Sequence, residues 1–194
     1  MTDILLTLST IITVGAIIPY VSDILKSKTK PNVVSWFTWT LLFVLSSAAA
    51  FVAHQYPSAI LSGSAALECL IVVILGLWAG EYKYSWFDGI CQLGTGIGFG
   101  AWLIFNSPLI AILMSIFIDL VGSLPTIRHG WLAPYEETWI TFALSGFGAL
   151  LALAAVRQVS FIAVVMPIWL VLINIILTST ILISRKFQSE PELA

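Results

Sequence analysis

Charged side chains are scarce in this sequence of 194 residues. Lys and Arg together number 8 and Asp and Glu 10, so charged residues make up 9% of the chain, whereas 59% are hydrophobic. Soluble domains carry about 25% charged residues, since polar groups must cover the surface that meets water. The composition therefore excludes a soluble enzyme and a disordered chain. With a net charge of −2 and no basic patch, it also excludes a nucleic-acid-binding protein. The solvent of such a chain is the lipid bilayer.

Cysteine and histidine are also rare, with two of each. Cys69 and Cys91 lie in apolar runs, form no CxxC pair and have no metal-ligand spacing to His54 or His129, so we expect no metal site and no bound cofactor. The glycine-rich stretch 94–100 lacks the spacing of a nucleotide-binding loop and instead offers small-xxx-small pairs for helix packing. No motif pairs a nucleophile or a metal with a base, and an enzyme is not expected.

Long apolar runs, in contrast, fill most of the chain. A membrane-spanning helix needs about 20 mostly apolar residues, because a helix rises 1.5 Å per residue across about 30 Å of hydrocarbon. We predict an all-α membrane protein with seven transmembrane helices. They are expected at 4–23, 33–53, 57–79, 85–105, 108–127, 137–156 and 161–184.

Lys and Arg are unevenly distributed over the connections between these spans. All but Arg157 fall in the first, third and fifth connections or in the C-terminal tail. Because positive charge stays on the cytoplasmic side, we expect the N-terminus outside and the C-terminus in the cytoplasm. The predicted location is the plasma (inner) membrane.

An internal repeat relates the two halves of the chain. Pro19 ends the first predicted span and Trp36 opens the second, while Pro125 and Trp139 stand in the corresponding places of the fifth and sixth. The pattern predicts two parallel three-helix repeats joined by a linker helix. The predicted bundles are residues 1–81 and 107–184, with the linker helix at 82–106 and a cytoplasmic tail at 185–194.

Residues 19–36, with the sequence PYVSDILKSKTKPNVVSW, form a proline-containing helix end, a basic turn and a serine-started helix. This segment resembles the PQ-loop family, which includes the SWEET and SemiSWEET sugar carriers; residues 119–142 resemble it more weakly. Tyr20 and Thr126 stand where that family has glutamine. The PnuC-type vitamin carriers have a similar three-one-three arrangement, and Trp36 and Trp39 have the WxxW spacing of that group.

Two acidic side chains lie well inside predicted spans, away from the span ends: Glu68 in the third and Asp119 in the fifth. A charge at bilayer depth costs about 2.5–3.5 kcal/mol on insertion scales, so such groups usually face a cavity or a partner. We expect one or both to be protonated at neutral pH and to bind a solute or a coupling proton. The structural alternative is a carboxyl group that holds two helices together.

The resemblance implies further site residues. In the carriers of that family, a tryptophan of the second helix and a polar residue of the third helix of each repeat line the cavity. This implies Trp36 or Trp39 with Glu68, and Trp139 with Asn174. Trp36 and Trp139 lie close to span starts, where interfacial anchoring is the alternative.

Three further residues have positions that suggest a role. Pro19 and Pro125 lie near matching helix ends, where a proline bends the helix, so they are predicted hinges, with a static kink as the alternative. Asp88 lies at the start of the fourth span, where a capping role is favoured.

The sequence thus predicts a small secondary transporter, either a uniporter or proton-coupled, that moves a small polar solute such as a sugar by alternating access. The alternatives are a PnuC-like vitamin or nucleoside carrier, and a non-transporting receptor or structural membrane protein of the same fold. The expected partners are the solute and the lipid bilayer, and the sequence is compatible with a homo-oligomer.

Overall fold

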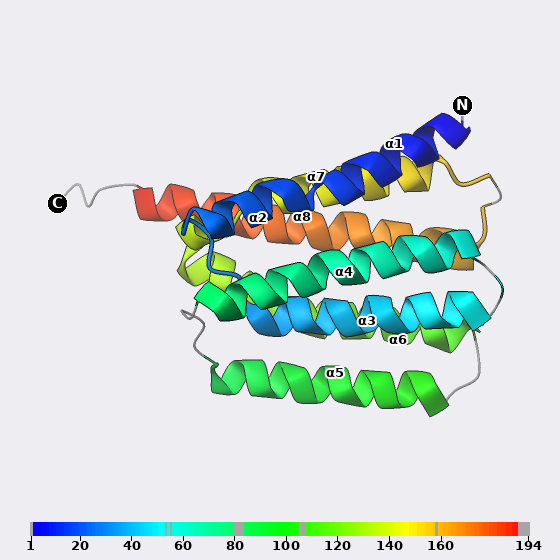
Figure 1. Ribbon diagram of the computed structural model, residues 1–194, viewed down its shortest axis with the longest axis horizontal. Coiled ribbons are helices and arrows are strands. Elements are labelled where there is room, and N and C mark those ends of the chain that lie inside the picture. The colour runs from blue at the N-terminus through cyan, green and yellow to red at the C-terminus, as the bar shows by residue number, and fades with distance from the viewer. Residues whose placement is uncertain are drawn as a thin grey trace. The chain divides into compact units, whose positions relative to one another are not determined.

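The computed structural model of the protein describes residues 2–52, 54, 56–79, 84–104, 108–157 and 159–189. Over these residues the regular structure is helical throughout, which confirms the all-α prediction for this part of the chain (Figure 1). The elements are α1 (Thr2–Gly15), α2 (Ile17–Leu25), α3 (Val33–Val52), α4 (Tyr56–Ala79), α5 (Trp86–Ile104), α6 (Pro108–Leu132), the short 3-10 helix η1 (Pro134–Glu136), α7 (Trp139–Ala154) and α8 (Phe161–Ser189).

Within the described part of the chain, five helical stretches are long and apolar enough to cross a membrane, as in an integral membrane protein. They are Asp3–Leu25, Val33–Val52, Ile60–Ala79, Leu109–Leu132 and Ala163–Gln188. Helix α7 is apolar but shorter. The chain is therefore compatible with an all-α membrane protein of several spans.

The helix bounds follow the predicted spans closely, with two differences at charged helix ends. Helix α6 continues to Leu132 and α8 to Ser189, so the first residues of the expected tail at 185–194 are helical. Hydropathy locates apolar runs, and a helix can continue past them into polar sequence. The expected break between the fourth and fifth predicted spans, at 106–108, falls mostly on residues outside the described part. Gln55, between the second and third spans, and residues 81–83, between the third and fourth, also lie outside it.

The first predicted span contains a break. Helix α1 ends at Gly15 and α2 begins at Ile17, with the Ala16 amide donating to the carbonyl of Thr13 at 3.2 Å. Pro19 explains why the helix breaks at Ala16. A proline lacks the amide hydrogen, and its ring clashes with the carbonyl four residues earlier, here that of Gly15.

The chain forms two compact units that we describe separately. Unit 1 contains residues 1–29 and 126–194, and unit 2 contains residues 30–125. These boundaries differ from those of the bundles expected at 1–81 and 107–184. The three-one-three repeat of the sequence stays a prediction.

In unit 1, α1 and α2 lie along α7, and α7 lies along α8. Ser9 and Thr13 lie against α7 where it carries a glycine, since the Ser9 hydroxyl donates to the carbonyl of Gly148 at 2.7 Å and a Cβ on that glycine would collide with the Thr13 hydroxyl. Tyr20 continues this face, with its ring edge-on to Phe142 at 6.1 Å between centroids. Ser9, Thr13 and Tyr20 thus belong to a helix-packing face of the first predicted span.

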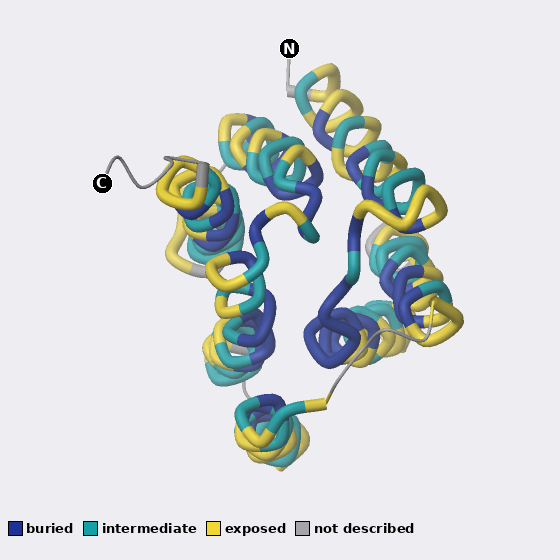
Figure 2. The backbone as a smooth tube through the Cα atoms, turned by 90° about the vertical axis from the view of Figure 1, so that its left-hand side faces the viewer, coloured by how far each residue is buried: buried dark blue, intermediate teal, exposed yellow. Residues whose placement is uncertain are grey.

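In unit 2, α3 lies along α4 and also contacts α5. A Cβ on Gly98 would lie 2.6 Å from Ile118 and one on Gly94 would lie 3.0 Å from Val121, whereas Gly96 and Gly100 have open space. One of the two predicted small-xxx-small pairs therefore brings α5 close to α6. Figure 2 shows that helices carry exposed stripes alongside buried ones, as helices in contact with lipid do.

Candidate functional site

Glu68 and Asp119 lie at the same level of unit 2. Helices α3 and α4 are antiparallel (Figure 1), and Gly63 faces Ser47 while Gly76 faces Pro31 and Val33. By this register Glu68 lies level with the middle of α3, near Leu42. Gly122 of α6 faces Thr38, and α6 is antiparallel to α3 (Figure 1). Asp119 comes three residues before Gly122, so it lies about 4.5 Å farther along α3, also close to the level of Leu42.

The two acids also share a neighbour. Both lie within electrostatic range of the Cys69 thiol, which is buried on α4. Asp119 is 6% exposed, and Glu68 is half-buried. Glu68 and Asp119 therefore lie at a similar level of unit 2, and their role as a site stays a prediction.

Trp36 and Trp39 lie on α3, next to this level. Their rings meet edge-on, with 5.0 Å between centroids. Both side chains are buried, and the indole Nε1 of Trp39 has no hydrogen-bond partner among the described residues. A buried N–H donor without an acceptor is costly, so Trp39 offers a donor to any polar group that reaches it.

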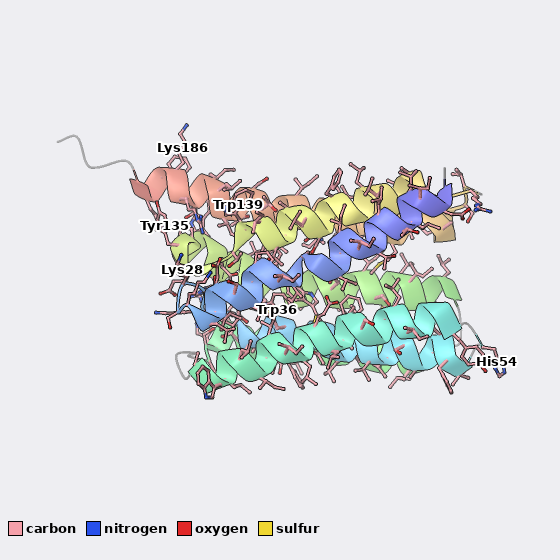
Figure 3. All side chains as sticks on the ribbon, turned by 45° about the horizontal axis from the view of Figure 1, so that its top comes forward. Lys28, Trp36, His54, Tyr135, Trp139 and Lys186 are labelled. Carbon is pink, nitrogen blue, oxygen red and sulfur yellow. The ribbon has the colours of Figure 1, made fainter. Side chains whose placement is uncertain are left out.

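The other predicted site residues belong to unit 1. Asn174 lies where α7 and α8 approach closely. A Cβ added to Gly146 of α7 would lie 3.0 Å from the Cβ of Asn174. Its amide donates to the carbonyl of Leu170, one turn earlier on α8, at 2.9 Å. Trp139 is the first residue of α7 and is partly exposed (Figure 3).

The two predicted hinge prolines differ in their surroundings. Pro19 accompanies the break between α1 and α2. Pro125 lies inside α6, which continues through it without interruption, and it is the last residue of unit 2. Helix α6 thus passes from one unit to the other at a residue that lacks a backbone hydrogen-bond donor.

Asp88 caps α5, as the sequence predicts. Its Oδ2 accepts hydrogen bonds from the backbone amide and the hydroxyl of Ser85, both at 2.7 Å, and the Asp88 amide faces the Ser85 hydroxyl at 3.3 Å. This reciprocal arrangement is a capping box. The Asp88 Oδ1 accepts from the side-chain amide of Asn32 at 3.4 Å, and Asn32 itself caps α3 through the Ser35 amide.

Another buried carboxyl group, which the sequence did not reveal as a site, lies in unit 1. Glu137 precedes α7 and is 1% exposed. Its Oε2 accepts the hydroxyl of Tyr20 at 2.8 Å, and its Oε1 has no hydrogen-bond partner among the described residues. The Nε2 of His129 is 4.0 Å from that oxygen, beyond hydrogen-bond reach.

Side chains of several elements surround Glu137. Arg185 of α8 donates to the backbone carbonyls of Glu137 and Pro134, at 2.8 and 2.9 Å, and does not reach the carboxylate with a hydrogen bond. Beside it, the Thr138 hydroxyl contacts Thr29 at 2.5 Å and donates to Asp23 of α2 at 3.0 Å. Figure 3 shows Tyr135 and Lys186 at this end of unit 1.

Burial raises the pKa of Glu137 from its usual 4.5 to about 8. The hydrogen bond from Tyr20 lowers this pKa, the neighbouring charge of Glu136 raises it and that of Arg185 lowers it, all less than burial does. Glu137 therefore keeps its proton at neutral pH. The sequence signal for this site is an acidic residue at the start of the predicted span 137–156, two positions before the first residue of α7.

Comparison with known proteins found no matching family model, no similar curated protein and no similar solved structure.

Proposed function

We propose that the protein is a small secondary transporter, a uniporter or a proton-coupled carrier, that moves a small polar solute such as a sugar by alternating access. The observation that carries the proposal is the level shared by Glu68 and Asp119 at the middle of unit 2, one turn from Trp39. Carboxyl groups at bilayer depth are expensive and are typically retained on solute or ion pathways.

The donors and acceptors of this level suit a hydroxylated solute. Carboxylate oxygens accept hydrogen bonds from hydroxyl groups, and the free indole N–H of Trp39 can donate to one. An aromatic face beside them can stack on the apolar side of a sugar ring. Trp36, Trp39, Glu68 and Asp119 form the proposed site; Trp139 and Asn174 belong to unit 1 and are left out of it.

The position of Pro125 supports alternating access. A rocking motion needs a place where a continuous helix bends at low cost, and a proline inside a helix supplies one. In α6 this place coincides with the boundary between the two units. The resemblance of residues 19–36 to the PQ-loop carriers is in line with such a motion.

Thermal stability of the detergent-purified protein against a panel of sugars, nucleosides, vitamins and amino acids tests the proposal. A solute at a hundred times its Kd adds about 2.7 kcal/mol of stability, because it binds the folded state alone. We expect a hydroxylated solute to raise Tm in the wild type and in Ser46→Ala, whose lost hydroxyl only donates within α3. The Tm shift should be lost in Glu68→Gln and Trp39→Phe. Liposomes should take up the solute with the wild type and Ser46→Ala, and not with the two site variants.

A Tm shift that survives unchanged in both site variants, or a bound solute that liposomes do not take up, would contradict the proposal. A nucleoside or vitamin as the bound solute would favour the PnuC-like alternative. Binding without uptake would favour the receptor.

Asp119→Asn should fold with near wild-type stability, because an amide resembles a protonated carboxyl group. We expect this variant to bind the solute with an affinity that no longer changes with pH, since the titrating group is gone. Binding isotherms at acidic and neutral pH check this. A variant with the pH dependence of the wild type would show that Asp119 is not the proton site.

A further inference from the structure

We propose that Glu137 is a proton-binding site of unit 1: with its proton bound, the carboxyl group keeps Tyr20, and with it α2, against the start of α7, and loss of the proton favours opening of that contact. Such a site would operate whether or not the protein carries a solute. It would make the attachment of α2 depend on the proton concentration at this end of unit 1.

The geometry provides too few partners for an ionised Glu137. A carboxylate has about four acceptor positions, and here one hydrogen bond, from Tyr20, reaches the side chain. The other oxygen is buried without a hydrogen-bond partner among the described residues. A buried charge without compensation is far more costly than a buried neutral group, so the proton is retained while the site is closed.

The charged and titratable groups around Glu137 do not supply the missing partner. On α8, Arg185 directs its two hydrogen bonds to backbone carbonyls. On α6, the His129 ring stands 4.0 Å from Oε1 and 3.8 Å from Glu136 of η1. On α2, the Asp23 side chain accepts a hydrogen bond from the Thr138 hydroxyl and is itself an acidic group. None of these places a cation in hydrogen-bond contact with the carboxylate.

Tyr20 makes the proton state of Glu137 relevant to α2. Its side chain is fully buried, and its hydroxyl joins α2 to a residue 117 positions away in sequence. An ionised Glu137 can gain hydrogen bonds from water only if the Tyr20 side chain moves away from it. Tyr20 follows the break at Ala16, so α2 can shift without bending α1, which Ser9 holds against α7.

Hydrogen exchange of the α2 amides in the full-length protein, corrected for intrinsic rates and referred to those of α3, tests this site. In the wild type, the opening constant of α2 should rise by up to about tenfold per pH unit between 4.5 and about 8 and then level off, since the open form releases the proton. In Glu137→Gln, which mimics the protonated form, the protection of α2 should stay high and independent of pH.

Two variants identify the proton carrier. Glu136→Gln removes the adjacent, more exposed carboxyl group and should keep the pH dependence of α2 opening. The pH at which opening levels off should be slightly lower, because the charge of Glu136 raises the pKa of Glu137. His129→Gln should also keep it. A pH dependence that persists in Glu137→Gln, or that disappears in His129→Gln, would overturn the proposal, in the second case because the imidazole is the group that titrates.

Discussion

Two buried carboxyl groups stand at the beginnings of helices, and their surroundings are opposite. Asp88 of unit 2 is 3% exposed and accepts hydrogen bonds at both oxygens, from Ser85 and Asn32. Glu137 of unit 1 is 1% exposed and accepts one, from Tyr20. Burial alone does not decide the role of an acidic side chain. The number of donors that meet it does.

The difference assigns the two groups to different tasks. Donors at both oxygens compensate for the loss of water, so Asp88 fixes the start of α5 and joins it to the connection before α3. A single donor leaves Glu137 best stabilised as a neutral acid, and a neutral acid can later release its proton. The first group is structural, whereas the second can respond to pH.

The largest expected effect is on the pH dependence of stability. Because the folded-state pKa of Glu137 is raised above the unfolded value, the proton stabilises the folded protein fully below about 4.5, and this stabilisation is lost as the pH rises to about 8. The slope reaches at most about 1.4 kcal/mol per pH unit. Tm measured over this range should fall more steeply for the wild type than for Glu137→Gln; parallel curves would mean that Glu137 gains no proton on folding.

Removal of Asp88 should have a smaller effect that involves no proton. Asp88→Ala deletes the acceptor of the capping box and leaves the Ser85 and Asn32 donors without it, which should cost about 1–3 kcal/mol. Asp88→Asn keeps one side-chain oxygen as acceptor and should cost less. Thermal unfolding of the three proteins provides the comparison. Equal stability of Asp88→Ala and the wild type would show that the cap does not stabilise α5.

Loss of the one donor to Glu137 should have the smallest effect. Tyr20→Phe removes a hydroxyl that donates to a buried acceptor and should lower the unfolding free energy by about 1 kcal/mol, more above pH 8, because hydrogen bonds to a charged acceptor are stronger. Tyr135→Phe is the matched control, since its exposed hydroxyl donates weakly to the Arg185 carbonyl at 3.3 Å. Equal losses in the two variants would contradict a special role for the Tyr20 hydroxyl.

The sequence predicted the features that depend on local chemistry. Apolar runs located the helices to within a few residues, the position of Asp88 at a span start agreed with a cap, and the spacing of Gly94 and Gly98 agreed with close helix packing. The break at Ala16 follows from Pro19, although the sequence indicated only a bend. These features involve residues near one another in the chain, whose geometry a helix fixes.

The features that depend on long-range contacts were not predictable in the same way. Nothing in the local pattern shows that Tyr20 meets Glu137, because the pairing is determined by how α2 packs on α7. The same holds for the membership of the two units, in which the first helix lies with α7 and α8. The predicted span 137–156 begins at Glu137, and nothing in its local sequence shows that packing buries this carboxyl group.

The most direct test of the proton on Glu137 is infrared difference spectroscopy of the purified protein during a pH titration. A protonated carboxyl group has a C=O stretch separate from that of a carboxylate. We predict a band that is present at neutral pH, disappears with a midpoint near 8, and is missing in Glu137→Gln but retained in Glu136→Gln. A wild-type spectrum that matches that of Glu137→Gln at neutral pH would show that Glu137 is ionised in the folded protein, and would contradict the account.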